Sequence, residues 1–565
     1  MPFASASTWH SIRGRSIPLA TAVALSTSIY LTHTYYTPLL ADEAIPSALG
    51  SGKKPKFPIA SDVNPLTPLA WGTNRYLTLY PDPNTSVVKK PTPLTHLGST
   101  PLRDLVIAEK YGACVDARGD CWMWGAGYDP SGEIGRSLKG KGIASLVPAP
   151  AKLIALSQNG KLYVVSASKA FQDAKAYRNE RSWWNYLFGT DPGVDFVELK
   201  AEGGLKFGER WTGVSAGVHH LLAVTNKGRT FSLPLSPAGN SHRQLGTRQV
   251  FETPFPVPSS SSSALTLSPQ LPPESDIRFA TTLTEIPSLK GLEVAQVATS
   301  DRTSFVRTPA GRILGWGANE SGQIGLGANA AVEMINVPVE VVLAKNYPGG
   351  TALRCLDIKA AGQMTFFTVE RALAGKDPAI DLLACGNGMS GSLGNGLWSS
   401  ASGVPTRVKT VSGLQEYSEK DRAFRPLGIH NVSLSPSSSP HVFAVLDTVT
   451  QADQAGVKQG LYGKDVMVWG GNVDYQLGNG KRSSLAVPQH LPALVDKFTD
   501  APSEKKESIL SSGTISPMPH SRLQLHASKA NAYDLDGKLI QRNVKCEEAV
   551  VAGWNASVLY NKIIL

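Results

Sequence analysis

The sequence lacks the residue patterns of the common enzyme and metal sites. It contains no HExxH zinc motif and no GxxxxGK[ST] phosphate loop. Its five cysteines are odd in number and show no CxxC spacing: Cys114, Cys121, Cys355, Cys385 and Cys546. They are expected to be reduced, buried thiols rather than a disulfide or zinc framework. The sequence therefore predicts no catalytic, cofactor-binding or metal-binding residue, and the protein is expected not to be an enzyme.

Acidic residues are absent from positions 1–41, and Asp42 is the first. Arg13 and Arg15 precede an apolar run from Ile17 to Tyr36, amid many serines, threonines and alanines. This composition is typical of a mitochondrial transit peptide. As a helix, the run would span about 30 Å, the hydrocarbon thickness of a bilayer. Residues 1–41 are predicted to be a mitochondrial transit peptide with a transmembrane segment at about 17–36, which would place the protein at the inner membrane. A cleaved presequence alone and a secretory signal are the alternatives.

Charged residues are also few, at 18% of the chain, whereas glycines number 53 and prolines 39. This balance favours turn-rich β structure over helices. The net charge is +10 and no arginine-rich tract is present, so no nucleic-acid partner is expected. Residues 42–66 contain prolines and lysines and are predicted to be a linker.

The stretch from Ala310 to Gly327 combines a turn, a strand and a loop rich in glycine. Gly311 suits a tight turn that requires positive φ. The apolar residues after it, including Trp316, can form a short strand. Gly317 and the later glycines allow the chain to bend where a side chain would clash. Taken alone, the stretch predicts only a hairpin followed by an irregular loop.

Looser copies of this pattern recur along the chain. Three keep a Trp-Gly or Cys-Gly strand: 118–135, 384–394 and 468–478. Three keep only the turn: Asn159-Gly160, Lys227-Gly228 and Asp536-Gly537. Many copies share an upstream strand, of which 214–225 is the clearest. The residues expected to be structural in the repeat are Trp71, Trp124, Trp316, Gly317, Trp469 and Gly470.

Each repeated unit is too small to bury its own hydrophobic face, so several must pack around one axis. Regular short strands without helical periodicity between them predict an all-β fold, a β-propeller. The stretches 118–135, 214–228, 310–327 and 464–480 resemble the repeat of the regulator of chromosome condensation family. This resemblance implies a seven-bladed propeller over 67–565.

The two ends of the repeat region are expected to complete each other. Leu69 to Asn74 forms a Trp-Gly strand without an upstream partner, and Val551 to Leu559 forms an upstream strand without its Trp-Gly strand. Their pairing would close the ring and remove an exposed sheet edge. Counting every turn plus this split unit gives eight units, so the degenerate copy at 150–168 is expected not to form a full blade.

Four stretches depart from the repeat, near 168–195, 252–275, 435–440 and 498–520. The first concentrates aromatic side chains that are candidates for contact with a partner: Trp183, Trp184, Tyr186 and Phe188. The alternative is that they cap one end of the propeller as core. The other three stretches are expected to be disordered surface loops.

Two groups of polar residues are candidates for a site of chemistry. His219 and His220 lie on a predicted strand, where hydrogen bonding between blade elements is favoured over metal binding. Asp116, Asp120 and Glu133 lie near one turn, but their spacing does not show that they converge on a substrate.

The resemblance also carries expectations about function. For the founding member of the family it implies guanine-nucleotide exchange on a small GTPase. A propeller with a mitochondrial leader, however, looks like the mitochondrial member known in fungi, which is associated with the inner membrane and with assembly of ubiquinol–cytochrome c reductase. The resemblance therefore implies a non-enzymatic scaffold that binds respiratory-chain assembly intermediates. A guanine-nucleotide exchange factor and an enzyme with its site in the propeller channel remain alternatives.

Overall fold

The computed structural model describes eight stretches of the chain: 64–172, 194–247, 272–327, 332–375, 377–418, 421–448, 463–492 and 522–565. Their regular structure is almost entirely β-strand, which confirms the all-β prediction. The helices in them are short 3-10 turns: η1 (Thr95–Leu97), η2 (Lys169–Phe171), η3 (Pro237–Asn240), η4 (Pro287–Leu289) and η5 (Leu343–Asn346). In these stretches no helix has the length and apolar character needed to cross a membrane. The predicted leader at 1–41 lies outside the described residues, as do most of the predicted linker and the predicted loop at 498–520.

Most sheets contain a four-stranded antiparallel unit in which strands consecutive in sequence pair side by side. Three units are separate sheets. They are β3 (Asp104–Ile107), β4 (Gly112–Val115), β5 (Cys121–Trp124) and β6 (Gly135–Leu138); β15 (Gln296–Thr299), β16 (Thr303–Arg307), β17 (Ile313–Ala318) and β18 (Met334–Glu340); and β19 (Ala352–Ala361), β20 (Met364–Ala372), β21 (Ala379–Gly386) and β22 (Ser402–Arg407).

Two further units share an eight-stranded sheet because their outer strands, β10 and β14, pair in parallel. They are β7 (Ile143–Pro148), β8 (Lys152–Ser157), β9 (Leu162–Ser166) and β10 (Phe196–Ala201), and β11 (Trp211–Ala216), β12 (His220–Thr225), β13 (Thr230–Pro234) and β14 (Thr282–Glu285). Another unit carries a short fifth strand on β27. Its strands are β25 (Ile429–Leu434), β26 (His441–Leu446), β27 (Lys464–Gly470), β28 (Leu485–His490) and β29 (Gln524–Leu525).

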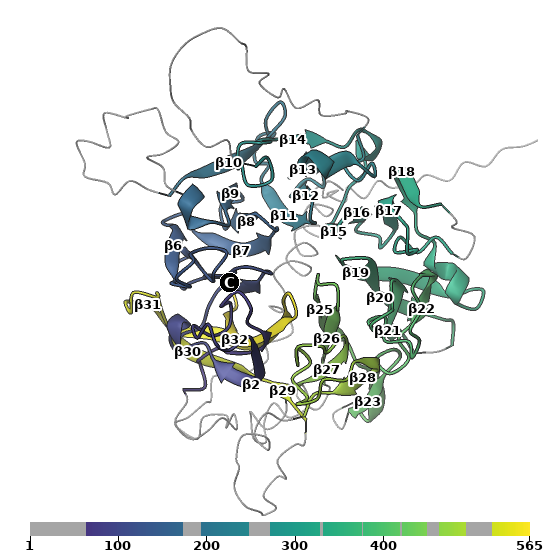
Figure 1. The fold of residues 1–565 in the computed structure, drawn as a ribbon. Coiled ribbons are helices and arrows are strands. Elements are labelled where there is room, and N and C mark those ends of the chain that lie inside the picture. Colours follow the sequence, from purple (N-terminus) through teal and green to yellow (C-terminus); the bar gives the residue numbers. More distant parts are fainter. Residues whose placement is uncertain are drawn as a thin grey trace, which may run out of the picture.

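The units stand side by side around a common axis, as in a β-propeller (Figure 1). The first strands β15, β19 and β25 lie near the axis, whereas the last strands β18, β22 and β28 lie at the rim (Figure 1). The hydrophobic core is divided among the interfaces between neighbouring units. Phe305 of β16, for example, packs edge-on against Phe367 of β20, with ring centroids 6.2 Å apart in a cluster shared by both units. A unit therefore buries its face only when its neighbour is present.

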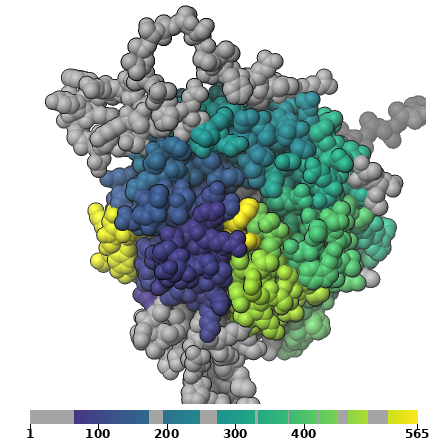
Figure 2. Space-filling view, in the orientation of Figure 1, coloured from purple at the N-terminus to yellow at the C-terminus, as the bar shows by residue number. Residues whose placement is uncertain are grey.

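The ring closes where the two ends of the described chain meet. β1 (Leu69–Thr73) pairs antiparallel with β32 (Ala556–Ile563), with Trp71 opposite Ser557. The sheet continues outward through β2 (Val87–Pro93) and inward through β31 (Leu539–Ala552). The terminal strands thus pair as predicted. In Figure 2 the purple N-terminal residues lie directly beside the yellow-green C-terminal part of the ring.

Two sequence-based expectations about the repeat are wrong. The copy at 150–168 supplies β8 and β9, the two central strands of a full four-stranded unit. The surplus turn is Asp536-Gly537, which joins β30 (Ala527–Tyr533) to β31 in a hairpin that extends the closing sheet. The miscount arose because a tight turn has the same sequence in a blade and in an added hairpin.

Two connections also differ from expectation. The stretch 435–440, predicted to be a disordered loop, is a short link between β25 and β26 in which Ser435 and Ser437 are buried and hydrogen-bonded to each other at 2.9 Å. Between β22 and β25 the chain forms a hairpin, β23 (Gln415–Ser418) and β24 (Ala423–Pro426), that the sequence analysis did not predict.

Deletion of residues 67–75 should destabilise the whole ring, because it removes β1 together with the buried Trp71. We expect the free energy of unfolding to fall by at least about 3 kcal/mol, the cost of deleting a large buried aromatic, with the lost ladder hydrogen bonds in addition. Chemical denaturation measures the change. Trp398→Ala is the control, because Trp398 is 55% exposed and its loss should be nearly neutral. A deletion variant that unfolds like the parent would contradict closure by β1.

Candidate functional site

The four tryptophans singled out in the repeat lie at the seams between neighbouring units. Each is at most 1% exposed, and each indole Nε1 donates a hydrogen bond to a backbone carbonyl in a loop of the preceding unit. The donor and acceptor pairs, at 2.7–2.9 Å, are Trp71 with Gln476, Trp124 with Thr78, Trp316 with Gln244 and Trp469 with Ser392. A buried indole N–H requires such a partner, and in all four cases the partner belongs to the preceding unit.

The β21 unit has a cysteine at the position where β1, β5, β17 and β27 have tryptophan. Cys385 Sγ lies 3.3 Å from the Gln323 carbonyl oxygen, and burial raises the pKa of its thiol. All five cysteines are buried and free, in agreement with the expectation of reduced thiols. A neutral, buried thiol is a poor nucleophile, so Cys385 acts as a small substitute for the indole.

Glycine is required beside the acceptor carbonyls. Gly394 and Gly478 follow their acceptor residues by two positions and have φ of 68° and 71°. A Cβ added at Gly394 would lie 2.8 Å from Trp469 Nε1, and one at Gly478 would lie 2.8 Å from Trp71 Nε1. Both the backbone conformation and the close approach of the indole therefore exclude a side chain. Gly317 and Gly470, after their tryptophans, have φ of 102° and 98° and meet the neighbouring strand in the same way.

A serine and a histidine extend the hydrogen bonding at the Trp316 seam. Ser304 Oγ donates to the Gln244 carbonyl at 2.6 Å, the same oxygen that accepts from Trp316. Ser304 Oγ in turn lies 2.8 Å from Nε2 of the fully buried His220. Because the serine proton is directed to the carbonyl, His220 must donate from Nε2. His220 thus makes the inter-unit contact that its sequence position favours, while His219 Nδ1 lies 2.9 Å from Ser236 Oγ.

The closing seam repeats this arrangement. Ser557 Oγ donates to the Gln476 carbonyl at 2.7 Å, Trp71 donates to the same oxygen, and His441 Nε2 lies 2.9 Å from Ser557 Oγ. Burial lowers the pKa of both His220 and His441 to about 3, so both rings are neutral at physiological pH. These histidines stabilise the seams through their hydrogen bonds to Ser304 and Ser557.

The other polar groups also have structural partners. Asp116 Oδ1 accepts the backbone N–H groups of the turn at 118–120, and Asp116 Oδ2 accepts Trp122 Nε1 at 2.9 Å. Asp120 Oδ1 accepts the Gly140 N–H at 2.7 Å. Within the described stretches no three His, Cys, Asp or Glu side chains are arranged to hold a metal ion.

One ionic cluster lies at the closing seam. Glu547 of β31 is 3.2 Å from Lys464 Nζ of β27 and 3.5 Å from His430 Nε2 of β25. Burial lowers the pKa of His430, but its contacts with Asp447 and Glu547 outweigh burial and raise the pKa overall. The cluster joins two neighbouring units through ion pairs.

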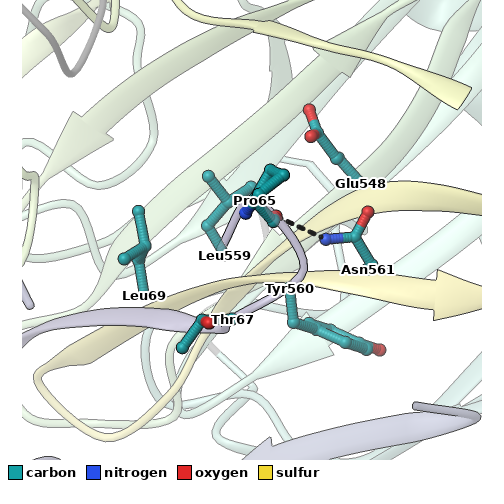
Figure 3. Close-up of a pocket in the computed structure, with 7 residues that line it drawn as sticks. All are labelled: Pro65, Thr67, Leu69, Glu548, Leu559, Tyr560 and Asn561. Carbon is teal, nitrogen blue, oxygen red and sulfur yellow. Dashed lines mark hydrogen bonds between the residues drawn. The ribbon is translucent and has the colours of Figure 1, made fainter. Parts of the chain in front are cut away.

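A small pocket lies at the start of the described chain, beside the closing strands (Figure 3). Its lining residues are Pro65, Thr67, Leu69, Glu548, Leu559, Tyr560 and Asn561. Glu548 is buried, which raises its pKa, and its Oε2 accepts the His526 N–H at 3.0 Å. Asn561 Nδ2 donates to the Pro65 carbonyl at 3.2 Å, the dashed line in Figure 3. Glu548 and Tyr560 are the titratable residues of this lining, and burial raises the pKa of both.

The aromatic candidates Trp183, Trp184, Tyr186 and Phe188 lie outside the described residues. The acceptor loops of the seams were not predicted from the sequence. Their shared signal is a polar residue followed by Leu or Ile and then Gly, as in Gln244-Leu-Gly246, Gln323-Ile-Gly325 and Gln476-Leu-Gly478. The motif was visible, but its role as the partner of the next tryptophan was not.

Comparison with known proteins supports the assignment of the repeat. Residues 310–367 match the family described as "Regulator of chromosome condensation (RCC1) repeat", which confirms the predicted resemblance. The matched residues run from the turn between β16 and β17 into β20. The sequence repeat is therefore offset from the sheet and contributes strands to two neighbouring units.

Relatives and solved structures extend the comparison. "Protein FMP25, mitochondrial" of Saccharomyces cerevisiae is 22% identical over 425 residues, which are 73% of this chain and 64% of that protein, less than two thirds of its length. Prp20p of Saccharomyces cerevisiae is 15% identical, with 89% of this chain and 92% of that chain covered and a TM-score of 0.50. Human WBSCR16 is 14% identical, with 88% and 99% covered and a TM-score of 0.50. At these identities the two structures show a shared fold and nothing further.

Acid should weaken the seams through the buried histidines. The folded pKa of His220 is about 3, below its ordinary value of 6.5, so its stabilising contribution is complete above pH 6.5 and is lost as the pH falls toward 3. Over that interval each such histidine should cost about 1.4 kcal/mol of stability per pH unit. His220→Gln should be less stable at pH 7 but should show a shallower fall, by about one proton, in denaturant unfolding between pH 7 and 5. An unchanged slope would exclude His220 as the titrating group.

Proposed function

We propose that this chain is a non-enzymatic scaffold at the mitochondrial inner membrane that helps to assemble ubiquinol–cytochrome c reductase. The observation that carries the mitochondrial part is the similarity to "Protein FMP25, mitochondrial" over 73% of the chain. The acid-free, arginine-bearing start at 1–41 supports it independently, because it has the composition of a transit peptide. The role in reductase assembly rests on the resemblance to the fungal mitochondrial member of the family.

Binding is favoured over catalysis because the buried polar groups form structural hydrogen bonds. In the described residues, the most deeply buried histidines bond across the seams, and Asp116 and Asp120 accept backbone N–H groups of turns. Such groups stabilise the ring and leave the exposed loops as the surfaces on which partners can act. The proposed mechanism is that these loops, with the aromatic insert near 168–195, hold an assembly intermediate.

A propeller of seven blades is part of this proposal. Six four-stranded units precede the closing sheet, and β31, β32, β1 and β2 supply four antiparallel strands of a seventh. The pairing of β10 with β14 then joins two blades at the rim, and β30 is an addition to the last blade.

An exchange factor for a small GTPase is the second candidate. The specific observation in its favour is the shared fold with Prp20p, whose structure was reported with its binding properties to Gsp1p and histones. An exchange factor must accelerate nucleotide release from its GTPase, whereas a scaffold need not. A nucleotide-release assay with a Ran-type GTPase therefore separates the two candidates, and acceleration would favour the second.

Cell fractionation should recover the full chain in mitochondria, because of the composition of residues 1–41. Carbonate extraction should leave most of it with the membrane if the apolar run at 17–36 is retained as an anchor. Recovery in nuclei, or modification with N-glycans, would contradict the mitochondrial proposal. Complete release by carbonate would contradict only the anchor.

Affinity purification from detergent-solubilised mitochondria should recover reductase assembly intermediates with the tagged chain. Trp183→Ala combined with Trp184→Ala should weaken that recovery while the melting temperature stays unchanged, because aromatic anchors at an interface commonly contribute about 2 kcal/mol each. Phe207→Ala is the matched control, because Phe207 is a fully exposed aromatic residue outside the insert. A lowered melting temperature with normal recovery would instead assign the insert to the core.

A further inference from the structure

The loop between β21 and β22, residues 387–401, differs in charge from its counterparts in the ring. From Gly386 to Thr406 the sequence has no Asp, Glu, Lys, Arg or His. Counterpart loops between third and fourth strands all carry charged residues, among them Asp129 and Glu133, Glu320 and Glu333, and Lys481 and Arg482. Because the loops are repeats of one another, the lack of charge is a property of this loop and not of the fold.

The same loop exposes large apolar side chains. Met389 is 64% exposed, Leu397 59% and Trp398 55%, and Val487 of the adjacent β28 is 44% exposed. These four residues are called the loop patch below. Single exposed apolar residues are ordinary, but tryptophan, leucine and methionine on one uncharged loop are not.

Backbone contacts bring the members of the loop patch together. The Gly388 N–H donates to the Ser399 carbonyl at 2.8 Å, and this contact draws together the two ends of the loop that carry Met389 and Trp398. The Gly396 N–H donates to the Ala486 carbonyl at 2.9 Å, which sets Leu397 next to Val487. The loop patch thus spans the seam between the β19–β22 and β25–β28 units, both drawn in green shades in Figure 2.

The loop is fixed to the neighbouring unit by close contacts. A Cβ added at Gly391 would lie 2.7 Å from Ala486 Cα, and Gly394 lies against the buried Trp469 indole. Ser392, between them, supplies the carbonyl that accepts Trp469 Nε1. The exposed side chains are therefore presented by a loop that is ordered by folding, which lowers the conformational cost of binding.

We propose that the loop patch is a docking surface for a partner protein whose contacting surface is apolar and uncharged. Interface cores are depleted of charge and enriched in tryptophan and methionine, as here. A charged partner group would lose its hydration without gaining a counter-ion in the stretch from Gly386 to Thr406. Anionic lipid and nucleic acid both require basic residues, which that stretch also lacks. The absence of charged residues from this stretch therefore favours binding of a protein whose contacting surface is apolar.

This inference rests on the proposed binding function, but it depends neither on the mitochondrial location nor on the aromatic insert. It adds a second surface to the scaffold, formed by residues that the structure describes. A negative result at position 398 would therefore contradict the loop patch without contradicting the scaffold proposal.

Site-specific photo-crosslinking in the full chain tests the proposal. A photoreactive phenylalanine analogue at position 398 should give an adduct with a second protein in the cells that express the chain. The same analogue at position 207 is the control, because Phe207 is fully exposed on a different loop. The partner identified from the adduct should then bind the purified full chain with an affinity that changes less than about twofold between low and high salt, since no ion pair is involved.

Substitution gives the energetic test. Leu397→Ser combined with Trp398→Ser should raise the dissociation constant for that partner by about 30-fold, equivalent to about 2 kcal/mol, whereas Phe207→Ser should leave it unchanged. The melting temperature should be the same in all three proteins, since the substituted side chains are exposed.

Several results would overturn the proposal. They are equal adducts from 398 and 207, adducts only with lipid or with a second copy of this chain, and a dissociation constant that rises tenfold with salt. If partners still co-purify with the tagged chain but position 398 gives no adduct, the loop patch is wrong and the scaffold remains. If neither method recovers a partner, both proposals fail.

Discussion

The hydrogen bond from a buried indole to a carbonyl of the preceding unit is the interaction on which the ring depends. Each indole has one N–H donor, and at four seams it is directed to the preceding unit instead of its own sheet. Leaving that donor unpaired in the core would cost about 1–3 kcal/mol, so a unit is complete only beside its neighbour. The glycines after the acceptors follow from the same contact, because the indole occupies the space of a side chain.

The buried polar groups stabilise the seams, whereas the exposed loops are the parts expected to bind partners. Seam carbonyls accept hydrogen bonds from tryptophan and serine, and the serines accept hydrogen bonds from neutral histidines. These buried polar groups are therefore satisfied by contacts between units. What differs from unit to unit is the exposed part of each loop. The same glycine framework carries Glu320 in one loop and Trp398 in the next. Specificity for partners is therefore expected where the repeat is least constrained.

The sequence predicted the parts of the fold that local patterns determine. The Ala310-Gly311 turn, the Trp316 strand and the pairing of the Trp71 strand with the C-terminal strand all follow from periodicity and from one unpaired half-unit at each end. The partner of each tryptophan did not follow, because Gln244 and Trp316 are 72 residues apart and only the closed ring brings them together. The exposure of Leu397 and Trp398 was equally hidden, since an apolar pair in a glycine-rich loop is as consistent with core as with surface.

The offset between repeat and sheet explains why the N-terminal strand is decisive. The matched stretch 310–367 contains both a donor, Trp316, and the acceptor loop that begins at Gln323, so one repeat serves two seams. In an open row of such repeats, the first unit has a tryptophan without an acceptor carbonyl, and the last unit has an acceptor carbonyl without a tryptophan. The stretch 69–80 supplies both, since Trp71 donates to the last regular unit and the Thr78 carbonyl accepts from the first. The stretch 69–80, which closes the ring, thus lies shortly after the proposed leader at 1–41 in the sequence. Closure of the propeller therefore depends on the part of the chain nearest to the proposed membrane segment.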